Sequence, residues 1–286
     1  MGVFQNNLLA GAAAAASAGG GGFYSHQIEQ SCYFDGTSSY LTKTWGQAAT
    51  TDDKKALSFW FKRNGASDTN SAIGSTTNTK IYTSHTGDSI EQLEINTNNP
   101  TGFSDQFGYF VGNGNNGAWY KGKLRDVSGW YHIAWIYDST QSTANDRVKI
   151  YLNGINLPTN DSDLWNYTNG GINPYPSQNH DTQFGKNGFR NDIGRYTYNN
   201  ASYWGGTLAE FIMIDGTAAY TDFGEFKNGV WIPKDPSGLT FGNNGFHLKF
   251  ENASDLGNDS SGNNNDWTAS GLSTDHQVLD SPTFGS

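Results

Sequence analysis

Charged residues are scarce in this chain, and basic residues are the scarcer kind. Charged side chains make up 15% of its 286 residues, against about 25% in ordinary soluble domains. The 17 lysines and arginines are outnumbered by 27 aspartates and glutamates, which gives a formal net charge of −10. An acidic chain lacks the cationic field that attracts phosphate groups, so the composition argues against a nucleic-acid partner.

Cysteine and long apolar runs are also missing. Cys32 is the single cysteine, so no disulfide can form within the chain. A lone cysteine is most often a small buried hydrophobe, and we expect Cys32 to be one. The stretch LLAGAAAAASAG near the N-terminus holds about ten consecutive apolar residues, half of what a bilayer-spanning helix needs. The sequence therefore predicts no membrane span.

Signature motifs of enzymes are absent too. Neither HExxH nor GxSxG occurs in the chain. GNGNNG at 112–117 fits G-x-G-x-x-G, but a dinucleotide site needs a helix after that loop, and the strand-like AWYKGKL follows instead. We interpret this glycine-rich segment as a β-turn. His132 lies between Tyr131 and Ile133 on an expected central strand, and we expect it to be a hydrogen-bonded structural residue.

Aromatic residues, glycine and asparagine are abundant, with 9 Trp, 15 Tyr and 17 Phe. Short apolar segments separated by turn residues are typical of an antiparallel β-sandwich. Leu57, Phe59 and Phe61 should share one buried face, Asp35-Gly36 should form a turn between two short strands, and Asn153-Gly154 is a hairpin signal. The expected strands lie within 31–41, at 56–62, 107–111, 118–124, 130–137, 146–152, 207–214 and 246–250.

The first 22 residues differ from the rest because they carry no charge. They resemble a signal peptide in their apolar stretch and in Ala16-Ser17-Ala18, but no lysine or arginine precedes that stretch. A linker or a docking arm is therefore the preferred interpretation. We predict two units, an N-terminal docking arm at 1–22 and a single β-sandwich at 23–286.

Aromatic residues set among polar ones are the candidate binding groups. Their ring faces suit the C–H surfaces of sugars as well as protein interfaces. Many of them lie between 156 and 203, where Asn, Gly, Tyr and Asp dominate and only DIGRY looks strand-like, and loops this long are usually functional. The candidates are Trp119, Tyr120, Trp165, Tyr167, Tyr175, Tyr196, Tyr198 and Trp204.

SGWYHIAWIYDSTQSTANDRVKIYLNGINL at 128–157 resembles the laminin-G-like, concanavalin A-like sandwich family, in which a Trp-x-His strand precedes one that ends in Tyr-x-Asn-Gly. YFDGTSSYL, LSFWFKR and DIGRYTYNNASYWGGTLAEFIMIDGTA are similar to further strands of that family. HLKFENASDLGNDSSGNNNDW at 247–267 resembles its first strand, here displaced to the C-terminal end as in a permuted chain. The resemblance covers 31–270 and implies an all-β, antiparallel jelly-roll β-sandwich.

Laminarinase-type glycoside hydrolases resemble this fold and carry E-x-D-x-x-E on one strand, which directs the carboxylates into a common cleft. That string is absent here. The nearest segment is Glu91-Gln92-Leu93-Glu94, whose two carboxylates would lie on opposite faces of a strand. We therefore expect a protein without enzymatic activity.

Related sandwiches often hold calcium at a loop rim through aspartate, asparagine and carbonyl oxygens. Aspartate and asparagine are also the standard turn residues, and the turn interpretation is preferred. Calcium is the one cofactor that the resemblance suggests. Two clusters fit by composition, namely Asp255, Asp259, Asn263, Asn265 and Asp266, and Asn160, Asp161 and Asp163.

Both ends of the chain and its SHQIEQSCYFDG entry resemble structural proteins of marine tailed bacteriophages, which carry such a module on a virion appendage. That resemblance implies a homotrimer on the phage particle, docked to other virion proteins through 1–22, with Phe4, Leu8 and Leu9 as anchoring side chains. The sandwich would present its aromatic rim to host-surface glycans. A purely structural capsid-decorating protein without a ligand and a secreted bacterial carbohydrate-binding protein are the alternatives.

Overall fold

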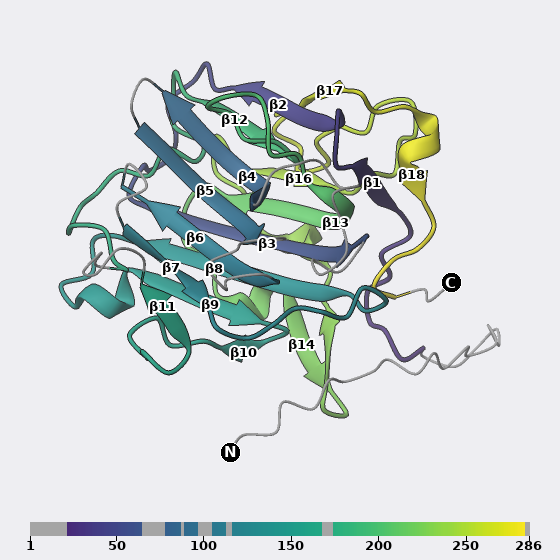
Figure 1. Cartoon of the computed structure of the whole chain (residues 1–286). Helices are drawn as coiled ribbons and strands as arrows, with labels where there is room; N and C mark the ends of the chain where they lie inside the picture. The colour runs from purple at the N-terminus through teal and green to yellow at the C-terminus, as the bar shows by residue number, and fades with distance from the viewer. Residues whose placement is uncertain are drawn as a thin grey trace.

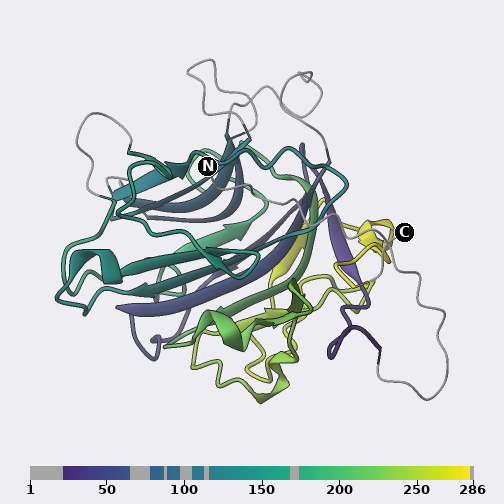
Figure 2. The ribbon, with the colours of Figure 1, turned by 90° about the horizontal axis from the view of Figure 1, so that it is seen from below.

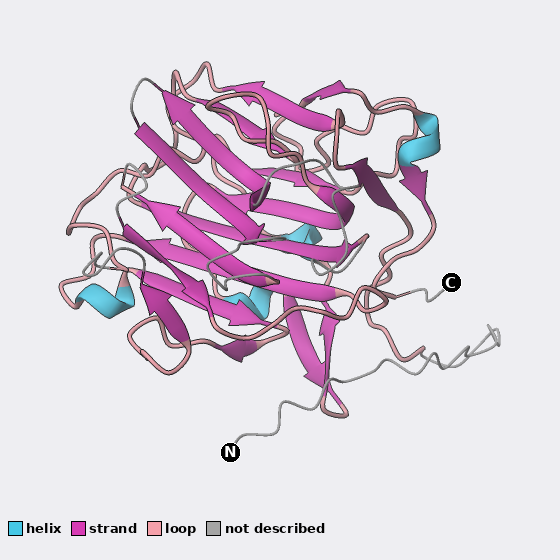
Figure 3. Cartoon of the chain, in the orientation of Figure 1, coloured by secondary structure: helices cyan, strands magenta, loops and turns pink. Residues whose placement is uncertain are grey.

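The computed structural model describes residues 22–64, 78–86, 89–96, 105–112, 116–167 and 174–283. Within them the chain forms two large antiparallel sheets packed face to face, with a small two-stranded sheet beside them (Figures 1 and 3). The predicted all-β antiparallel sandwich is confirmed. Apart from Gly22, the predicted docking arm and its anchoring residues Phe4, Leu8 and Leu9 lie outside the described residues.

The first sheet contains the strands predicted around the Trp-x-His segment. Asn153 and Gly154, with φ angles of 47° and 75°, turn β9 into β10, so the expected hairpin is confirmed. The order is β10 (Ile155–Asn156), β9 (Val148–Leu152), β8 (Tyr131–Asp138), β3 (Lys54–Arg63), β13 (Gly205–Ile214), β1 (Ser31–Asp35) and β18 (Gln277–Val278), and β16 (Phe246–Leu248) also pairs with β13.

The second sheet includes two long strands that the sequence did not predict, β4 and β5. Its order is β11 (Trp165–Tyr167), β7 (Asn116–Tyr120), β6 (Gln106–Val111), β5 (Ser89–Asn96), β4 (Asn78–Thr86), β12 (Arg190–Ile193), β2 (Tyr40–Thr44) and β17 (Thr268–Ser270). The small sheet is a hairpin of β14 (Gly224–Lys227) and β15 (Val230–Pro233). Short 3₁₀ turns are η2 (Ala144–Asp146), η4 (Tyr220–Asp222), η5 (Pro236–Gly238) and η6 (Thr274–His276).

The main core lies between the two large sheets. Leu57, Phe59 and Phe61 of β3 all point into it, as their alternation predicts. Phe59 stacks on Phe211 of β13 with 4.9 Å between the ring centroids. Cys32 is fully buried in the same core, which confirms the expectation for the lone cysteine.

The first sheet is buried on both of its faces. Ala56, Ala134 and Ile212 point away from the main core and pack against Phe223 and Phe241 in a second apolar cluster. Figure 2 shows the segment that carries these two residues, in green to yellow, on the far side of that sheet. No comparable strand layer of the described chain covers the far side of the second sheet, and that side carries the candidate site.

The Asp35-Gly36 turn joins the two sheets rather than two strands of a hairpin. β1 pairs with β13 and β18, whereas β2 pairs with β12 and β17. The Asp35 carboxylate accepts the backbone N–H groups of Thr37, Ser38 and Ser39, which closes the turn locally. An aspartate-capped turn of this kind sets the change of direction but does not decide which strands pair.

A β-bulge interrupts β13 between Ala209 and Ile212, where the register with β3 shifts. Glu210 adopts a φ of 47° at the bulge, an uncommon value for a residue other than glycine. Its carboxylate lies within hydrogen-bond distance of His26 on the N-terminal segment, at 3.0 Å, and also bonds His247 of β16. The bulge thereby ties β13 to two other parts of the chain.

Candidate functional site

The second sheet has one face in the core and another that points away from the first sheet, called the outer face below. Leu93 and Ile95 of β5 lie in the core, so Gln92 and Glu94 point to the outer face. In β12 the core side is occupied by Ile193, and Arg190 and Asp192 share the outer face.

Strand pairing brings Arg190, His85 and Gln92 into one row across the outer face. Arg190 of β12 lies directly opposite His85 of β4. Gln92 of β5 lies opposite Thr83, two residues before His85, so Gln92 and His85 are diagonal neighbours. Arg190 therefore meets, on one surface, two residues that lie about one hundred positions earlier in the chain.

Several side chains of this face carry a buried polar atom without a hydrogen-bond partner in the described chain. Leaving such an atom unpaired costs about 1–3 kcal/mol, so native proteins keep few of them without a reason. Other unpaired atoms include the indole N–H groups of core tryptophans such as Trp135 and Trp165. Besides the oxygens of Glu94, which is ion-paired with Lys80, those of the outer face are His85 Nε2, Gln92 Oε1, Gln106 Oε1 and Arg190 Nε.

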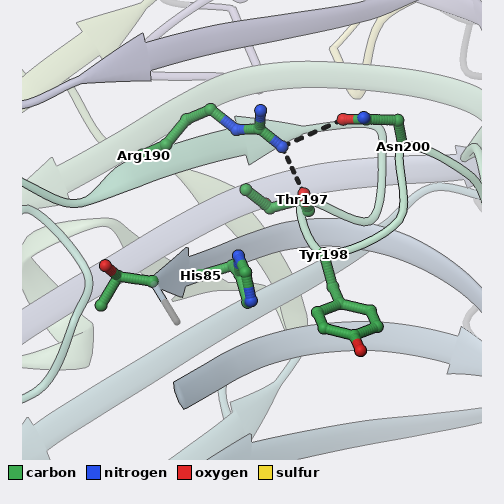
Figure 4. A pocket seen from close by; sticks show the side chains of 6 residues that line it. His85, Arg190, Thr197, Tyr198 and Asn200 are labelled. Atoms are coloured by element: carbon green, nitrogen blue, oxygen red, sulfur yellow. Dashed lines mark hydrogen bonds between the residues drawn. The ribbon is translucent and has the colours of Figure 1, made fainter. Parts of the chain in front are cut away.

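An open depression of about 410 Å³ lies at the β4–β12 end of this face (Figure 4). The loop after β12 forms one side of it and is held by a Tyr196–Ala201 bridge and by the Lys80 N–H, which donates to the Ser202 carbonyl at 3.1 Å. The depression is lined by His85, Thr86, Arg190, Thr197, Tyr198 and Asn200.

The guanidinium of Arg190 is held in place within the depression. Its Nη2 donates to the Thr197 carbonyl and, at 3.0 Å, to the Asn200 side-chain oxygen, as Figure 4 shows. Its Nε lies 3.6 Å from one oxygen of Asp192. Arg195 binds the other oxygen of Asp192 through Nε and Nη2, at 2.9 and 2.7 Å. Two guanidinium groups therefore share a single carboxylate.

Two aromatic candidates lie beside this arginine network. Tyr198 is 56% exposed, and its ring meets the His85 ring edge to face with 4.9 Å between centroids. Tyr196 is half-buried, and its ring lies 5.0 Å from the ammonium of Lys80, which forms a buried ion pair with Glu94. A binding role for Tyr196 and Tyr198 stays a prediction, and their position on the outer face is compatible with it.

The other predicted aromatic residues lie outside the depression. The prediction that they form an exposed binding rim is wrong for most of them, because they are buried. Trp165 packs against Tyr109 and Tyr120 in the core at 5.6 and 5.7 Å, and Trp204 packs against Phe61. Burial of large rings in the core stabilises the sandwich more than exposure would, because each ring removes a large apolar area from water. The buried candidates are Trp119, Tyr120, Trp165, Tyr175 and Trp204.

Trp119 is buried on the outer face, not in the core. Its ring covers Gly108, where an added Cβ would approach the indole to 2.5 Å, and it meets Phe110 edge to face at 5.3 Å. Tyr167 is half-buried and donates its hydroxyl hydrogen to the Thr159 carbonyl at 3.0 Å. Neither side chain lines the depression.

The carboxylate of Asp259, a calcium candidate, forms the hydrogen bonds of a turn. Its carboxylate accepts the backbone N–H groups of His247, Ser261 and Asn265 at 2.8 to 2.9 Å, which confirms the turn interpretation there. Asp266 accepts the Asp259 N–H, and Asn263 donates its amide to two backbone carbonyls.

Two further calcium candidates are aspartates in loops. Asp255 is exposed, and Asp161 accepts the Asp163 N–H within its own loop. Among the described residues, no group of three or more His, Cys, Asp or Glu side chains is arranged to hold a metal. A calcium site stays a prediction.

His132 is the structural residue that the sequence predicted. It is fully buried, Trp231 Nε1 donates to its Nδ1 at 3.1 Å, and its Nε2 lies 2.8 Å from Ser58 Oγ. Burial lowers the pKa of His132 to about 3, so its ring is neutral at physiological pH.

Glu91 and Glu94 lie on opposite sides of β5, as expected for residues three apart.

His85, Arg190, Gln92 and Asn200 were missed by the sequence analysis. His85 and Gln92 belong to strands that were not predicted, and Arg190 precedes a segment recognised only from Asp192 onward. Residues 83–85 and 190–192 are polar at every position, so no alternation of polar and apolar residues marks them as strands.

No protein-family model and no curated protein matches this chain. Among solved structures it is similar to a candidate carbohydrate-binding protein from Bacteroides ovatus, with a TM-score of 0.54 and 16% identity over 91% of this chain. The chain spans 63% of the length of that protein. At this identity the likeness establishes the shared fold, an antiparallel sandwich that a candidate carbohydrate-binding protein also uses.

Two fainter likenesses are to a pentraxin from Limulus polyphemus and to the LG1-3 region of the laminin α2 chain. The first has a TM-score of 0.44 and 13% identity, covering 68% of this chain and 80% of the pentraxin. The second has a TM-score of 0.38 and 12% identity, covering 65% of this chain and 31% of the laminin region. No helix in the described ranges is long and apolar enough to cross a membrane.

Proposed function

We propose that this protein is a non-enzymatic glycan-binding sandwich displayed on a bacteriophage particle, and that the depression on the outer face holds the glycan. The observation that carries the binding proposal is the exposed Tyr198 ring beside His85 and Arg190, two lining residues that each keep a buried polar atom without a hydrogen-bond partner in the described chain. A sugar suits such a lining, since its hydroxyls can bond polar side chains and its C–H face packs against an aromatic ring.

The absence of enzymatic activity is proposed from the state of the nearby carboxylates. Glu91 accepts hydrogen bonds from Thr182 Oγ1 and from the Gln183 and Gly112 N–H groups, so its oxygens are occupied. Glu94 is paired with Lys80. The six residues that line the depression include no carboxylate, whereas glycoside hydrolysis generally uses two.

The place on a virion is proposed from the likeness of the two ends of the chain to phage structural proteins. The protein would be a homotrimer, and residues 1–22 would attach it to other virion proteins. Small, uncharged residues suit such docking because they lose little side-chain entropy and let backbones approach closely. A ligand-free decorating protein and a secreted binding protein are the competing functions.

Binding is tested with a glycan array and calorimetry on the full-length protein. Tyr198→Ala should weaken binding at least about fivefold, because an aromatic platform of this kind contributes about 1–3 kcal/mol. Tyr33→Ala is the matched control, since Tyr33 is 36% exposed on β1 of the other sheet. Binding that Tyr198→Ala leaves unchanged would remove the depression as the site, and silence across the array would favour a decorating role.

Attachment is tested separately with particles assembled in the presence of intact and truncated protein. Deletion of residues 1–22 should leave a folded sandwich that is missing from purified particles. If the truncated protein still joins particles, the docking role of 1–22 is wrong. Light scattering of the intact protein decides between a trimer and other states.

A further inference from the structure

Among the described residues, the outer face carries more positive than negative charge, although the whole chain has a formal net charge of −10. The fixed charges on this face belong to β4, β5, β12 and the loop after β12, within the described residues. Lys80 is matched by Glu94, which leaves Arg190 and Arg195 to share Asp192. One guanidinium charge therefore has no carboxylate of its own in the described part of the chain.

Within the described ranges, Arg190 is the arginine that makes the weaker contact with the shared carboxylate. Asp192 is fully buried and is bound by Arg195 through two hydrogen bonds and by the Thr42 hydroxyl at 2.6 Å. The contact from Arg190 Nε to Asp192, at 3.6 Å, is longer than a hydrogen bond. The side chain of Arg190 is 36% exposed and lines the depression, whereas that of Arg195 is 8% exposed.

The other lining groups suit a sugar that carries an anion. Thr197 and Asn200 fix the guanidinium by accepting from Nη2, so little side-chain freedom is left to lose on binding. A held guanidinium pairs well with planar or tetrahedral oxyanions. Tyr198 offers an exposed ring beside it, and no carboxylate among the lining residues would repel the ligand.

We infer that the glycan held at this site is an acidic one, whose carboxylate or sulfate group pairs with Arg190 while its sugar ring packs against Tyr198. This inference rests on the proposed glycan-binding function. Carboxylate and sulfate present the same oxyanion chemistry to the guanidinium, so separate probes are needed to distinguish them.

The test measures binding of full-length protein to matched acidic and neutral oligosaccharides. Oligogalacturonate is compared with its methyl ester, and a sulfated galactan oligosaccharide with its desulfated form. We expect one acidic member to bind at least about tenfold more tightly than its neutral partner, and the preference to shrink as salt rises from about 0.05 to 0.5 M, because salt screens partly exposed charges.

Variants then test whether Arg190 causes the preference for acidic oligosaccharides. Arg190→Gln should remove the preference for the acidic oligosaccharide, and Arg190→Lys should retain part of it because the charge remains. Lys149→Gln is the control, since it removes one positive charge from an exposed position on β9 of the first sheet. A cooperative thermal unfolding transition establishes that each variant is folded. If Arg190→Gln does not fold, the binding of acidic and neutral oligosaccharides by the wild-type protein still tests the inference.

The outcomes separate this inference from the proposed function. Equal binding of the acidic and neutral members overturns the acidic-glycan inference and leaves glycan binding intact. If a folded Arg190→Gln protein binds the acidic and the neutral oligosaccharide equally weakly, the inference is also overturned. Arg190 would then hold the site in shape without pairing with the anion. No binding of any oligosaccharide by the wild-type protein overturns the proposed function itself.

Discussion

Replacing Glu210 by glutamine removes one buried charge and nearly preserves the shape of the side chain. Glu210 is 6% exposed at the β13 bulge and bonds His26 and His247. Burial by itself would raise the pKa of Glu210, but the hydrogen bonds from His247 and His26 outweigh it and lower the pKa from 4.5 to about 2. The carboxylate should therefore stabilise the fold in its charged form.

The size of this contribution follows from the change in pKa. A fall from 4.5 to about 2 corresponds to about 3 kcal/mol at about 1.4 kcal/mol per pKa unit. Because the pKa of Glu210 is lowered, the contribution is complete above pH 4.5 and is lost as the pH falls toward 2. The hydrogen bond with Glu210 raises the pKa of His26, against a smaller opposing effect of burial. That contribution is complete below pH 6.5 and is lost at higher pH.

Urea unfolding followed by tryptophan fluorescence measures both effects. At pH 5.5, Glu210→Gln should lower the free energy of unfolding by about 3 kcal/mol, and at pH 3.5 by about 2 kcal/mol, since protonation of the wild-type carboxyl narrows the difference. Glu29→Gln, at an exposed position, should change it by less than about 0.5 kcal/mol at either pH. A Glu210→Gln effect of equal size at both pH values would refute the reasoning.

Three further predictions concern buried groups. Asp215→Asn should cost about 3–5 kcal/mol in urea unfolding, because it leaves the fully buried Lys55 ammonium without its carboxylate; a loss below 1 kcal/mol would contradict this. Gly108→Ala should lower stability by about 1–3 kcal/mol, since the new methyl would overlap the Trp119 ring, and an unchanged melting temperature would count against that packing. Burial raises the pKa of the Cys32 thiol, so a thiol reagent should react with it only after denaturation; rapid reaction of the folded protein would show the core to be open.

The strands that the sequence predicted are those with an apolar side toward the main core. Along β8 and in the middle of β3, the residues that point inward are large hydrophobes such as Trp135 and Phe59, so the period of two is visible locally. β4 and β5 were missed because polar residues occupy both of their faces. Glu91, for example, lies on the core side of β5 and is satisfied by Thr182 and Gln183, about ninety residues away.

The candidate site was predicted only in part. Tyr196 and Tyr198 were identified because they stand in a polar loop, but the same local pattern also selected Trp165 and Trp204, which are core residues. A short window of sequence cannot distinguish a ring that faces solvent from one that faces a distant strand. Burial depends on residues that are far away in the chain.

The sequence by itself determined the all-β class, the short antiparallel strands and the structural role of His132, because these follow from local alternation, turn residues and composition. The tertiary structure decided which face became the candidate site. Arg190 meets His85 only because β12 pairs with β4, more than one hundred residues earlier in the chain. Asp192 serves two arginines because the loop after β12 folds back over the same sheet. Pairing of distant strands depends on the packing of the whole core, and no local pattern specifies it.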